Sequence, residues 1–166
     1  MFNIGDWVIY GGKGVCKVID IGKLETMSVA RDRIYYTLEP AHFSESRVFT
    51  PVDNSKVVIR PVITKEEAVA LIDQISQIET LWITDEKRRE SEYKEALKTC
   101  DCIEFVKIIK TIYQRKQTRL EVGKKMTASD EKYFRIAEDL LYSELAIALE
   151  MEQDKVKSYI LEHVKK

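Results

Sequence analysis

The first 60 residues alternate short apolar runs with glycine, proline and polar residues, a pattern typical of successive short β-strands. A glycine-rich stretch at residues 11–14 lies between two apolar runs and predicts a hairpin turn. Farther on, strict alternation puts Ile34, Tyr36 and Leu38 on one face of a half-buried strand. We expect five strands in all, over residues 7–10, 15–21, 33–39, 47–51 and 57–60.

After Pro61 the apolar positions recur at helical spacing. Thr64 and Glu67 have the spacing of a capping box, which predicts a helix from there to about Ile78. Further helices are expected to open at Thr84–Asp85, at Asp101 and at Thr127, the last running through Ala148, followed by a final helix around residues 156–164. On the helix after Asp101, the predicted apolar face holds Cys102, Phe105, Val106, Ile109, Ile112 and Tyr113.

These two patterns predict a mixed α+β protein with two domains. Residues 1–62 should form a small β-barrel of the SH3 or Tudor type, because five short strands in so few residues must bend strongly. Residues 63–166 should form a compact bundle of four or five helices.

The composition is that of a folded, highly charged protein, with 45% hydrophobic and 33% charged residues among 166. No apolar run approaches the roughly 20 residues that span a bilayer, and no signal peptide is evident at the start, so a cytoplasmic protein without membrane contact is expected. The net charge of −1 conceals an uneven distribution: residues 87–125 carry 12 basic and 6 acidic side chains. A basic middle segment gives information about the partners that the protein binds rather than about its fold.

Motifs for catalysis or metal binding give no positive signal. Lys13 stands in a glycine-rich stretch, but a phosphate-binding P-loop needs Ser or Thr after the lysine and a helix behind it. Three cysteines and two histidines lack metal-ligand spacing. The acidic pairs Glu66–Glu67, Asp85–Glu86 and Asp130–Glu131 all stand at predicted helix starts, where they oppose the helix dipole. We expect no enzyme, no cofactor, no metal and no small-molecule substrate.

The basic middle segment has two interpretations, a solvated helical face or a surface for nucleic-acid phosphates. Lys87, Lys94 and Lys98 recur at helical spacing with Arg88 and Arg89 beside them, and the candidates continue with Lys107, Lys110, Arg115, Lys116, Arg119, Lys124 and Lys125. On the helix after Asp101, Lys107, Lys110 and Arg115 are expected to point away from the apolar face. Because glutamates interrupt the row, any contact should be modest and local.

Trp82, just before the second predicted helix, also has two interpretations. It can staple the helix start to the core, or it can stack against unstacked bases.

The chain resembles the CarD/CdnL family of bacterial transcription regulators, in order and over nearly its whole length. The resemblance rests on Phe2-x-Ile4-Gly5-Asp6-x-Val8-x-Tyr10 with Gly14-Val15, on Val48 to Pro51, on Tyr93-Lys94-x-x-Leu97, on Ile112-Tyr113-Gln114-Arg115 and on Glu144-Leu145-Ala146-x-Ala148. It implies a Tudor-like domain that binds the β subunit of RNA polymerase. It also implies a helical domain that contacts promoter DNA at the upstream edge of the melted region and stabilises the open complex.

The chain departs from the family pattern at a position that the resemblance assigns to DNA contact. The family pattern places a wedge tryptophan four residues before the tyrosine that matches Tyr93, where this chain has Arg89. The nearest tryptophan is Trp82, and the stretch between Arg115 and Thr127 is longer than the family pattern.

For polymerase binding we expect the segment Arg47, Val48, Phe49 and Thr50, in which Arg47 and Phe49 share a face of a strand close to a proline. An edge strand can take up a partner strand by main-chain bonds. Two other functions remain open, a protein-binding adaptor without DNA contact and an RNA- or ribosome-associated factor.

Overall fold

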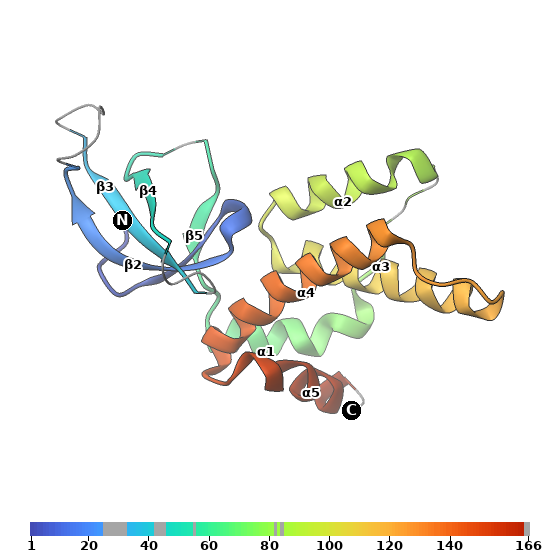
Figure 1. The fold of residues 1–166 in the computed structure, drawn as a ribbon. Coiled ribbons are helices and arrows are strands. Elements are labelled where there is room, and N and C mark those ends of the chain that lie inside the picture. The colour runs from blue at the N-terminus through green and yellow to red at the C-terminus, as the bar shows by residue number, and fades with distance from the viewer. Residues whose placement is uncertain (25–32, 42–45, 55, 82, 84, 165–166) are drawn as a thin grey trace. The chain divides into compact units, whose positions relative to one another are not determined.

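The structure is a computed structural model that describes residues 1–24, 33–41, 46–54, 56–81, 83 and 85–164 (Figure 1). The chain divides into two compact units, Met1–Val62 and Ile63–Lys166. It is a mixed α+β protein, in which an antiparallel sheet precedes a set of helices. Within the described residues, no helix has both the length and the apolarity needed to cross a membrane.

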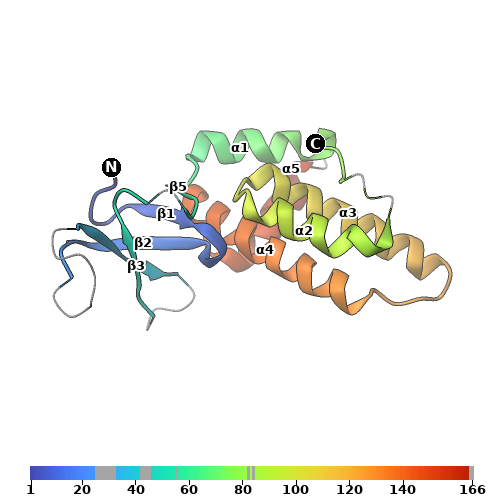
Figure 2. The same cartoon turned by 90° about the horizontal axis from the view of Figure 1, so that it is seen from above.

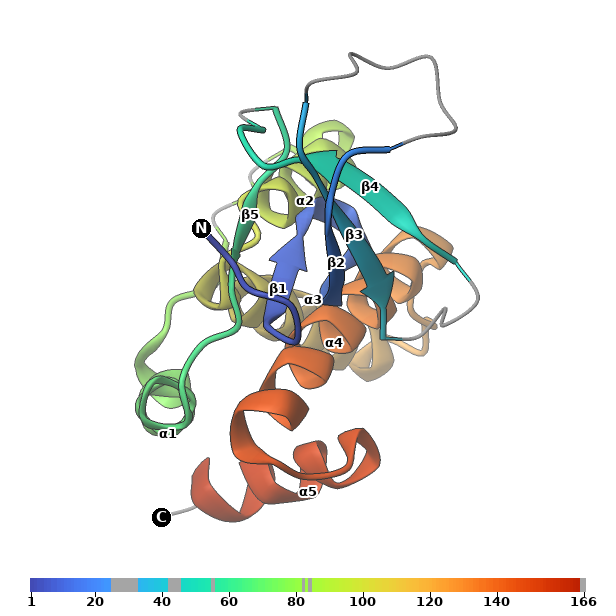
Figure 3. The ribbon, with the colours of Figure 1, turned by 90° about the vertical axis from the view of Figure 1, so that its left-hand side faces the viewer.

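The first unit is a five-stranded antiparallel sheet of Tudor-like type, as the sequence predicts. Its strands are β1 (Trp7–Tyr10), β2 (Val15–Gly22), β3 (Tyr35–Pro40), β4 (Val48–Pro51) and β5 (Ile59–Pro61). The order β4-β3-β2-β1-β5 leaves β4 and β5 at the two edges, and Figure 3 shows how strongly the sheet curls. The concave side holds a core of Val8, Cys16, Val18, Tyr36 and Leu38.

The predicted hairpin joins β1 to β2, with Val8 opposite Cys16. Its connection is a short 3₁₀ turn, Gly11–Lys13, between two glycines with positive φ. At Gly11, φ is +45° and a Cβ atom would lie 2.7 Å from a Val57 methyl group, so glycine is required there. The glycines therefore serve a turn between strands.

The alternation predicted for residues 33–39 is correct on one face and incomplete on the other. Tyr36 and Leu38 are buried as expected, at 3% and 0% exposure. Tyr35, placed by alternation on the exposed face, is only 8% exposed. Period-2 spacing gives the side of a strand on which a residue lies, but it does not say how well that side is covered by a strongly bent sheet.

The second unit consists of five α-helices and short 3₁₀ turns (Figures 1 and 2). In chain order they are α1 (Lys65–Gln74), η2 (Ile75–Gln77), η3 (Glu86–Arg88), α2 (Arg89–Lys98), α3 (Cys102–Glu121), α4 (Ala128–Leu149) and α5 (Gln153–Val164).

Side-chain caps begin most of these elements, as predicted. Thr64 and Glu67 form the full capping box of α1. Asp101 and Thr127 accept backbone N–H groups at the starts of α3 and α4. Asp85 caps the 3₁₀ turn η3 rather than an α-helix, and Thr84 lies outside the described residues.

Two apolar clusters lie on different sides of α3. One joins α1, α3, α4 and α5 around Phe105, Leu141 and Leu145. The other joins α2, α3 and the first half of α4 around Tyr93 and Ile108. The prediction of a single apolar face on α3 is therefore wrong in part: Ile108 is fully buried, whereas Tyr113 is 54% exposed.

A buried carboxylate ties the start of the second unit to its centre. Glu144 on α4 is 0% exposed. Its two oxygens accept the backbone N–H of Ile63 at 2.9 Å and face the Cys102 thiol at 3.1 Å. Because a buried acceptor without partners is costly, this side chain fixes where the helical unit begins.

Candidate functional site

The strand β4 has a free edge and presents two of the four residues predicted to bind polymerase. Among the strands of the described residues it pairs with β3 only, since it lies at the end of the strand order. Phe49 is 41% exposed, and the exposed Arg47 lies 3.6 Å from the Glu39 carboxylate. Val48 packs against the core of the sheet and Thr50 is 1% exposed. Within this segment, the side chains available to a partner are those of Arg47 and Phe49.

Five polar side chains in the helical unit form a closed ring that sequence spacing did not reveal. Arg115 of α3 donates to Glu86 of η3 at 3.0 Å, and its Nε lies 2.7 Å from the buried Asp130 carboxylate of α4. Arg89 of α2 also donates to Glu86, and it donates to the Tyr93 hydroxyl at 3.2 Å. Tyr93 in turn donates to Asp130 at 3.1 Å. The ring therefore binds η3, α2, α3 and α4 together.

The ring changes the interpretation of two predicted DNA-binding residues. The side chains of Arg89 and Arg115 are only 16% and 19% exposed, and both face Glu86. The sequence predicts that Arg115 points away from the apolar face of α3, but Glu86 of η3 and Asp130 of α4 contact its side chain, which is therefore mostly buried. The arginine hydrogen bonds, that of Arg115 foremost, lower the pKa of the Glu86 carboxyl below its usual value.

The acidic residues of the ring have a second role beyond the helix dipole. Asp130 does stand in the first turn of α4, where its backbone N–H donates to Thr127. Its carboxylate, however, is 1% exposed and is held by Arg115 and Tyr93. Burial raises the pKa of the Tyr93 hydroxyl, so this group remains a hydrogen-bond donor.

Lys110 is likewise engaged in the fold rather than pointing away from it. Its ammonium donates to the carbonyl oxygen of Ile75 at 2.8 Å and also to that of Ile78. These carbonyls lie at the C-terminal end of α1 and η2, which a cation stabilises. Lys107 forms a helical i,i+3 pair with Glu104 at 3.3 Å.

The predicted row Lys87, Lys94 and Lys98 does not form one α-helical stripe. Lys87 lies on η3, whose tighter winding breaks the helical spacing. Lys94 and Lys98 lie on α2 and pair with Glu90 at 3.7 Å and with Glu95 at 3.4 Å. Both lysines stay exposed, but each is offset by a neighbouring carboxylate.

The structure gathers other basic residues at one end of the helical unit. The start of α2 and the connection from α3 to α4 lie at this same end in Figures 1 and 2, and the contacts of Arg115 with Glu86 and Asp130 hold them together. We call this surface the basic end; it comprises Lys87, Arg88, Lys116, Arg119, Lys124 and Lys125. The stretch 115–125 alone carries five basic side chains and one acidic one.

Trp82, the candidate wedge, lies outside the described residues. Its neighbour Leu81 is anchored through its backbone N–H, which donates to the Thr111 hydroxyl of α3 at 2.8 Å.

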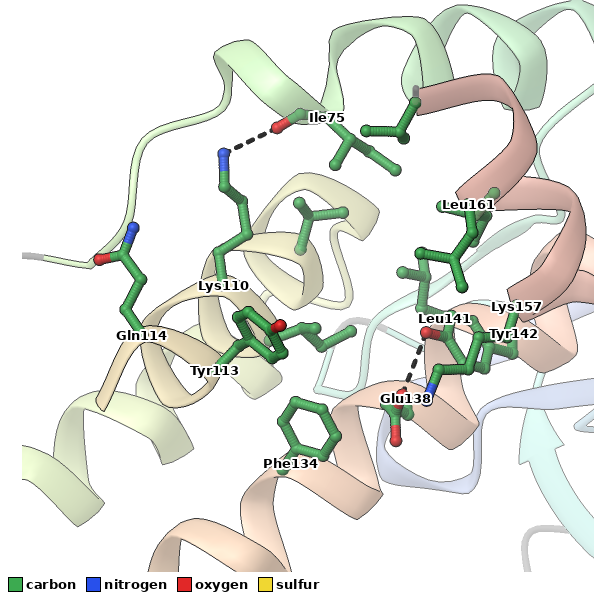
Figure 4. A pocket seen from close by; sticks show the side chains of 14 residues that line it. Ile75, Lys110, Tyr113, Gln114, Phe134, Glu138, Leu141, Tyr142, Lys157 and Leu161 are labelled. Atoms are coloured by element: carbon green, nitrogen blue, oxygen red, sulfur yellow. Dashed lines mark hydrogen bonds between the residues drawn. The ribbon is translucent and has the colours of Figure 1, made fainter. Parts of the chain in front are cut away.

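An apolar groove of about 380 Å³ lies between η2, α3, α4 and α5 (Figure 4). Phe134, Tyr113 and Leu161 line it, and the Tyr142 hydroxyl donates to Glu138 at 3.0 Å on its wall. Burial raises the pKa of that tyrosine far above its usual value, which makes it a poor proton donor to a substrate. The lining of the groove is mostly apolar.

The cysteines and carboxylates do not assemble a metal centre in the part of the chain that the structure describes. All three cysteines are buried, and burial raises the pKa of the Cys16 thiol to about 11. A thiol of that pKa is protonated at neutral pH and is a weak nucleophile.

Comparisons with known proteins match a family model to each of the two units. The model of the CarD-like/TRCF RID domain matches residues 2–63, and the model of the CarD C-terminal domain matches residues 64–161. A search of curated proteins returns no match. The two domain models together cover almost the entire chain, each over one of the two units. The chain therefore belongs to the CarD-like family of non-enzymatic, RNA polymerase-interacting transcription regulators.

Proposed function

We propose that the protein links RNA polymerase to promoter DNA and stabilises the open complex. In this proposal the sheet binds the β subunit of polymerase through β4, and the helical unit contacts DNA at the upstream edge of the melted region. The single observation that carries the DNA contact is the basic end, whose six basic residues belong to η3, to the last turns of α3 and to the α3–α4 connection, which lie at the same end of the helical unit. Such a surface favours backbone contacts with weak sequence preference.

The polymerase contact is supported by the edge position of β4. A strand at the end of a sheet exposes main-chain N–H and C=O groups that a partner strand can pair with. Phe49 and Arg47 beside that edge supply an apolar contact and a charge, which give selectivity to main-chain pairing.

The residues proposed for DNA binding differ in how exposed their side chains are. Lys87, Arg88, Lys116, Lys124 and Lys125 are exposed, and Arg119 is half-buried with its Nε donating to the Lys125 carbonyl at 2.7 Å. Arg89 and Arg115 are held in the ring, so we assign them the task of positioning the basic end. Lys94 and Lys98 contribute less because Glu90 and Glu95 offset their charge.

A salt titration of DNA binding tests the proposal. Binding of a forked promoter fragment is measured at several salt concentrations for the wild type, for Lys124→Gln/Lys125→Gln and for Lys94→Gln/Lys98→Gln. Removing one contact between a lysine and a phosphate should reduce the slope of log affinity against log salt by about 0.9 for duplex DNA. We expect the slope to fall further in the first variant than in the second. Identical slopes for all three proteins would refute phosphate contact by these lysines.

Co-purification distinguishes this function from the two alternatives. Recovery of polymerase subunits together with promoter DNA supports the proposal. Polymerase without any DNA affinity supports an adaptor that binds protein only. Ribosomal proteins in place of polymerase support an RNA-associated role.

A further inference from the structure

Two exposed apolar side chains project among the cations of the α3–α4 tip, which we define as residues 116–125. Leu120 is 51% exposed and Val122 is 69% exposed. Among the described residues of the helical unit, Val122 is the most exposed large apolar side chain. These two large apolar side chains, two positions apart in the sequence, leave apolar surface in contact with water, which is unfavourable.

The tip is held by the hydrogen bonds of a regular helix end. The Lys124 N–H donates to the Arg119 carbonyl at 2.8 Å and the Gly123 N–H donates to the Leu120 carbonyl at 3.0 Å. Gly123, at φ +74°, supplies the left-handed residue that this Schellman motif requires. The display of Val122 and Leu120 is thus fixed by backbone bonds and does not depend on a loose loop.

The usual apolar contact that closes this motif is missing from the tip. A Schellman motif often packs an apolar pair at the two positions that Arg119 and Lys124 occupy here. Both positions are basic, so Leu120 and Val122 are not used to close the turn. They remain available to a partner.

The charge around these two residues indicates the chemistry of that partner. Four cations, Lys116, Arg119, Lys124 and Lys125, stand within the tip against a single carboxylate, Glu121. A partner must therefore offer negative charge and apolar surface together, as nucleic acid does with its phosphates and its base and sugar faces. The tip lies at the same end of the helical unit as the start of α2, which η3 with Lys87 and Arg88 precedes.

We propose that Leu120 and Val122 make an apolar contact with the DNA that the basic end binds, either in a groove or on unpaired bases. This inference rests on the proposed function. The apolar contact adds to the binding free energy a contribution that does not depend on salt concentration, because apolar burial releases no counterions. Lysine contacts set the slope of a salt titration, whereas Leu120 and Val122 set the affinity that remains at high salt.

The test compares two double variants that replace the same two residue types. Leu120→Ser/Val122→Ser removes the apolar pair, and Leu161→Ser/Val164→Ser removes a pair on α5 of which Leu161 is also 51% exposed. We expect the first variant to bind forked promoter DNA about tenfold more weakly at every salt concentration, with an unchanged slope. The α5 variant should bind as the wild type does. Thermal melting of each protein confirms that the helical unit is folded, and Val122→Thr, which keeps the shape, serves if the double variant unfolds.

The arms of the experiment separate the outcomes. A loss of affinity seen equally on duplex and forked DNA places the apolar pair in a groove, and a loss on forked DNA alone places it on unpaired bases; both support the inference. Unchanged affinity of a folded variant overturns it. So does tighter binding of the wild type to anionic vesicles than to DNA, if that binding depends on the same two residues.

Failure of the proposed function gives a different result. If the wild type shows no salt-sensitive DNA binding, the proposed DNA contact itself is refuted. If Lys124→Gln/Lys125→Gln lowers the slope of the salt titration but Leu120→Ser/Val122→Ser has no effect on affinity, only the proposed apolar contact is refuted.

Discussion

At the residue scale, the ring around Glu86 shows how charged side chains of one type divide between fold and partner. Arg89 and Arg115 look in the sequence like their neighbours Arg88 and Lys116, yet they are mostly buried and paired, whereas those neighbours are exposed. Hydrogen bonds to an ionised carboxylate are roughly twice as strong as neutral ones. We therefore assign to the ring the task of keeping η3 in place against α3.

Replacing Glu86 by Gln should flatten the acid side of the stability profile. Hydrogen bonds from Arg115 and Arg89 lower the pKa of the Glu86 carboxyl in the folded protein. Its stabilising effect is therefore complete above the unfolded pKa of about 4.3 and is lost as the pH falls through the lower folded value. Chemical denaturation at a series of pH values from about 6 down to about 3 measures the effect, because the loss begins as the pH falls through the unfolded pKa.

The wild type should lose more stability over that range than Glu86→Gln does. The exposed Glu92 on α2 provides the control, since Glu92→Gln should keep the wild-type profile. Parallel profiles for the wild type and Glu86→Gln would show that the ring adds nothing to stability. The effect should be modest, because Glu86 is 65% exposed and solvent screens its ion pairs.

At the element scale, three helix starts are predicted correctly, whereas α2 begins at Arg89 rather than after Asp85 and the helix faces are predicted less well. Thr64, Asp101 and Thr127 cap helices at the expected positions, because a cap depends on residues within one turn. The faces of α3 depend on what packs against it. Spacing predicts one apolar face, but α2 covers a second side and buries Ile108.

The partners of the basic residues could not be predicted for the same physical reason. Arg115 meets Glu86, which lies 29 residues away in the chain, and Lys110 meets the end of α1, 35 residues away at Ile75. No periodicity within one helix carries that information. Counting basic residues along the sequence locates the charged region correctly, but only the fold separates the cations that cap and pair from those that remain exposed.

Lys110→Met should destabilise the helical unit by about 1.5–3 kcal/mol, the range for a hydrogen bond to a charged group. The reason is that the carbonyls of Ile75 and Ile78 lose this charged donor. Lys107→Met on the same helix removes an equal charge but only an i,i+3 pair, and it should cost about 0.5 kcal/mol or less. Urea unfolding of both variants makes the comparison. An equal loss of stability in the two would mean that charge, and not capping, is responsible.

The edge strand β4 carries a separate prediction. Arg47→Glu/Phe49→Ser should weaken pull-down of the polymerase β subunit by at least tenfold, a change of about 1.4 kcal/mol, while the sheet stays folded, because both side chains are exposed. Val58→Ser, at a residue 42% exposed next to the opposite edge strand, is the matched control. Undiminished pull-down by the folded double variant would remove these residues from the interface.

At the scale of the whole molecule, each unit carries one contact of the proposed function. The sheet offers an edge with Arg47 and Phe49, and the helical unit offers a basic end with an apolar tip. Holding polymerase and DNA by one chain raises the effective concentration of each contact for the other, so that two weak contacts suffice. It follows that removing either contact should abolish most of the effect, and removing both should add little.

The lifetime of an open promoter complex, followed after addition of a competitor that traps released polymerase, tests this account most directly. We predict that the full chain lengthens the lifetime about tenfold, which corresponds to about 1.4 kcal/mol. Arg47→Glu/Phe49→Ser and Lys124→Gln/Lys125→Gln should each remove most of that gain, and the combined variant should do no worse than either alone. A lifetime that the full chain leaves unchanged, while polymerase is shown to be bound by it, would contradict the account.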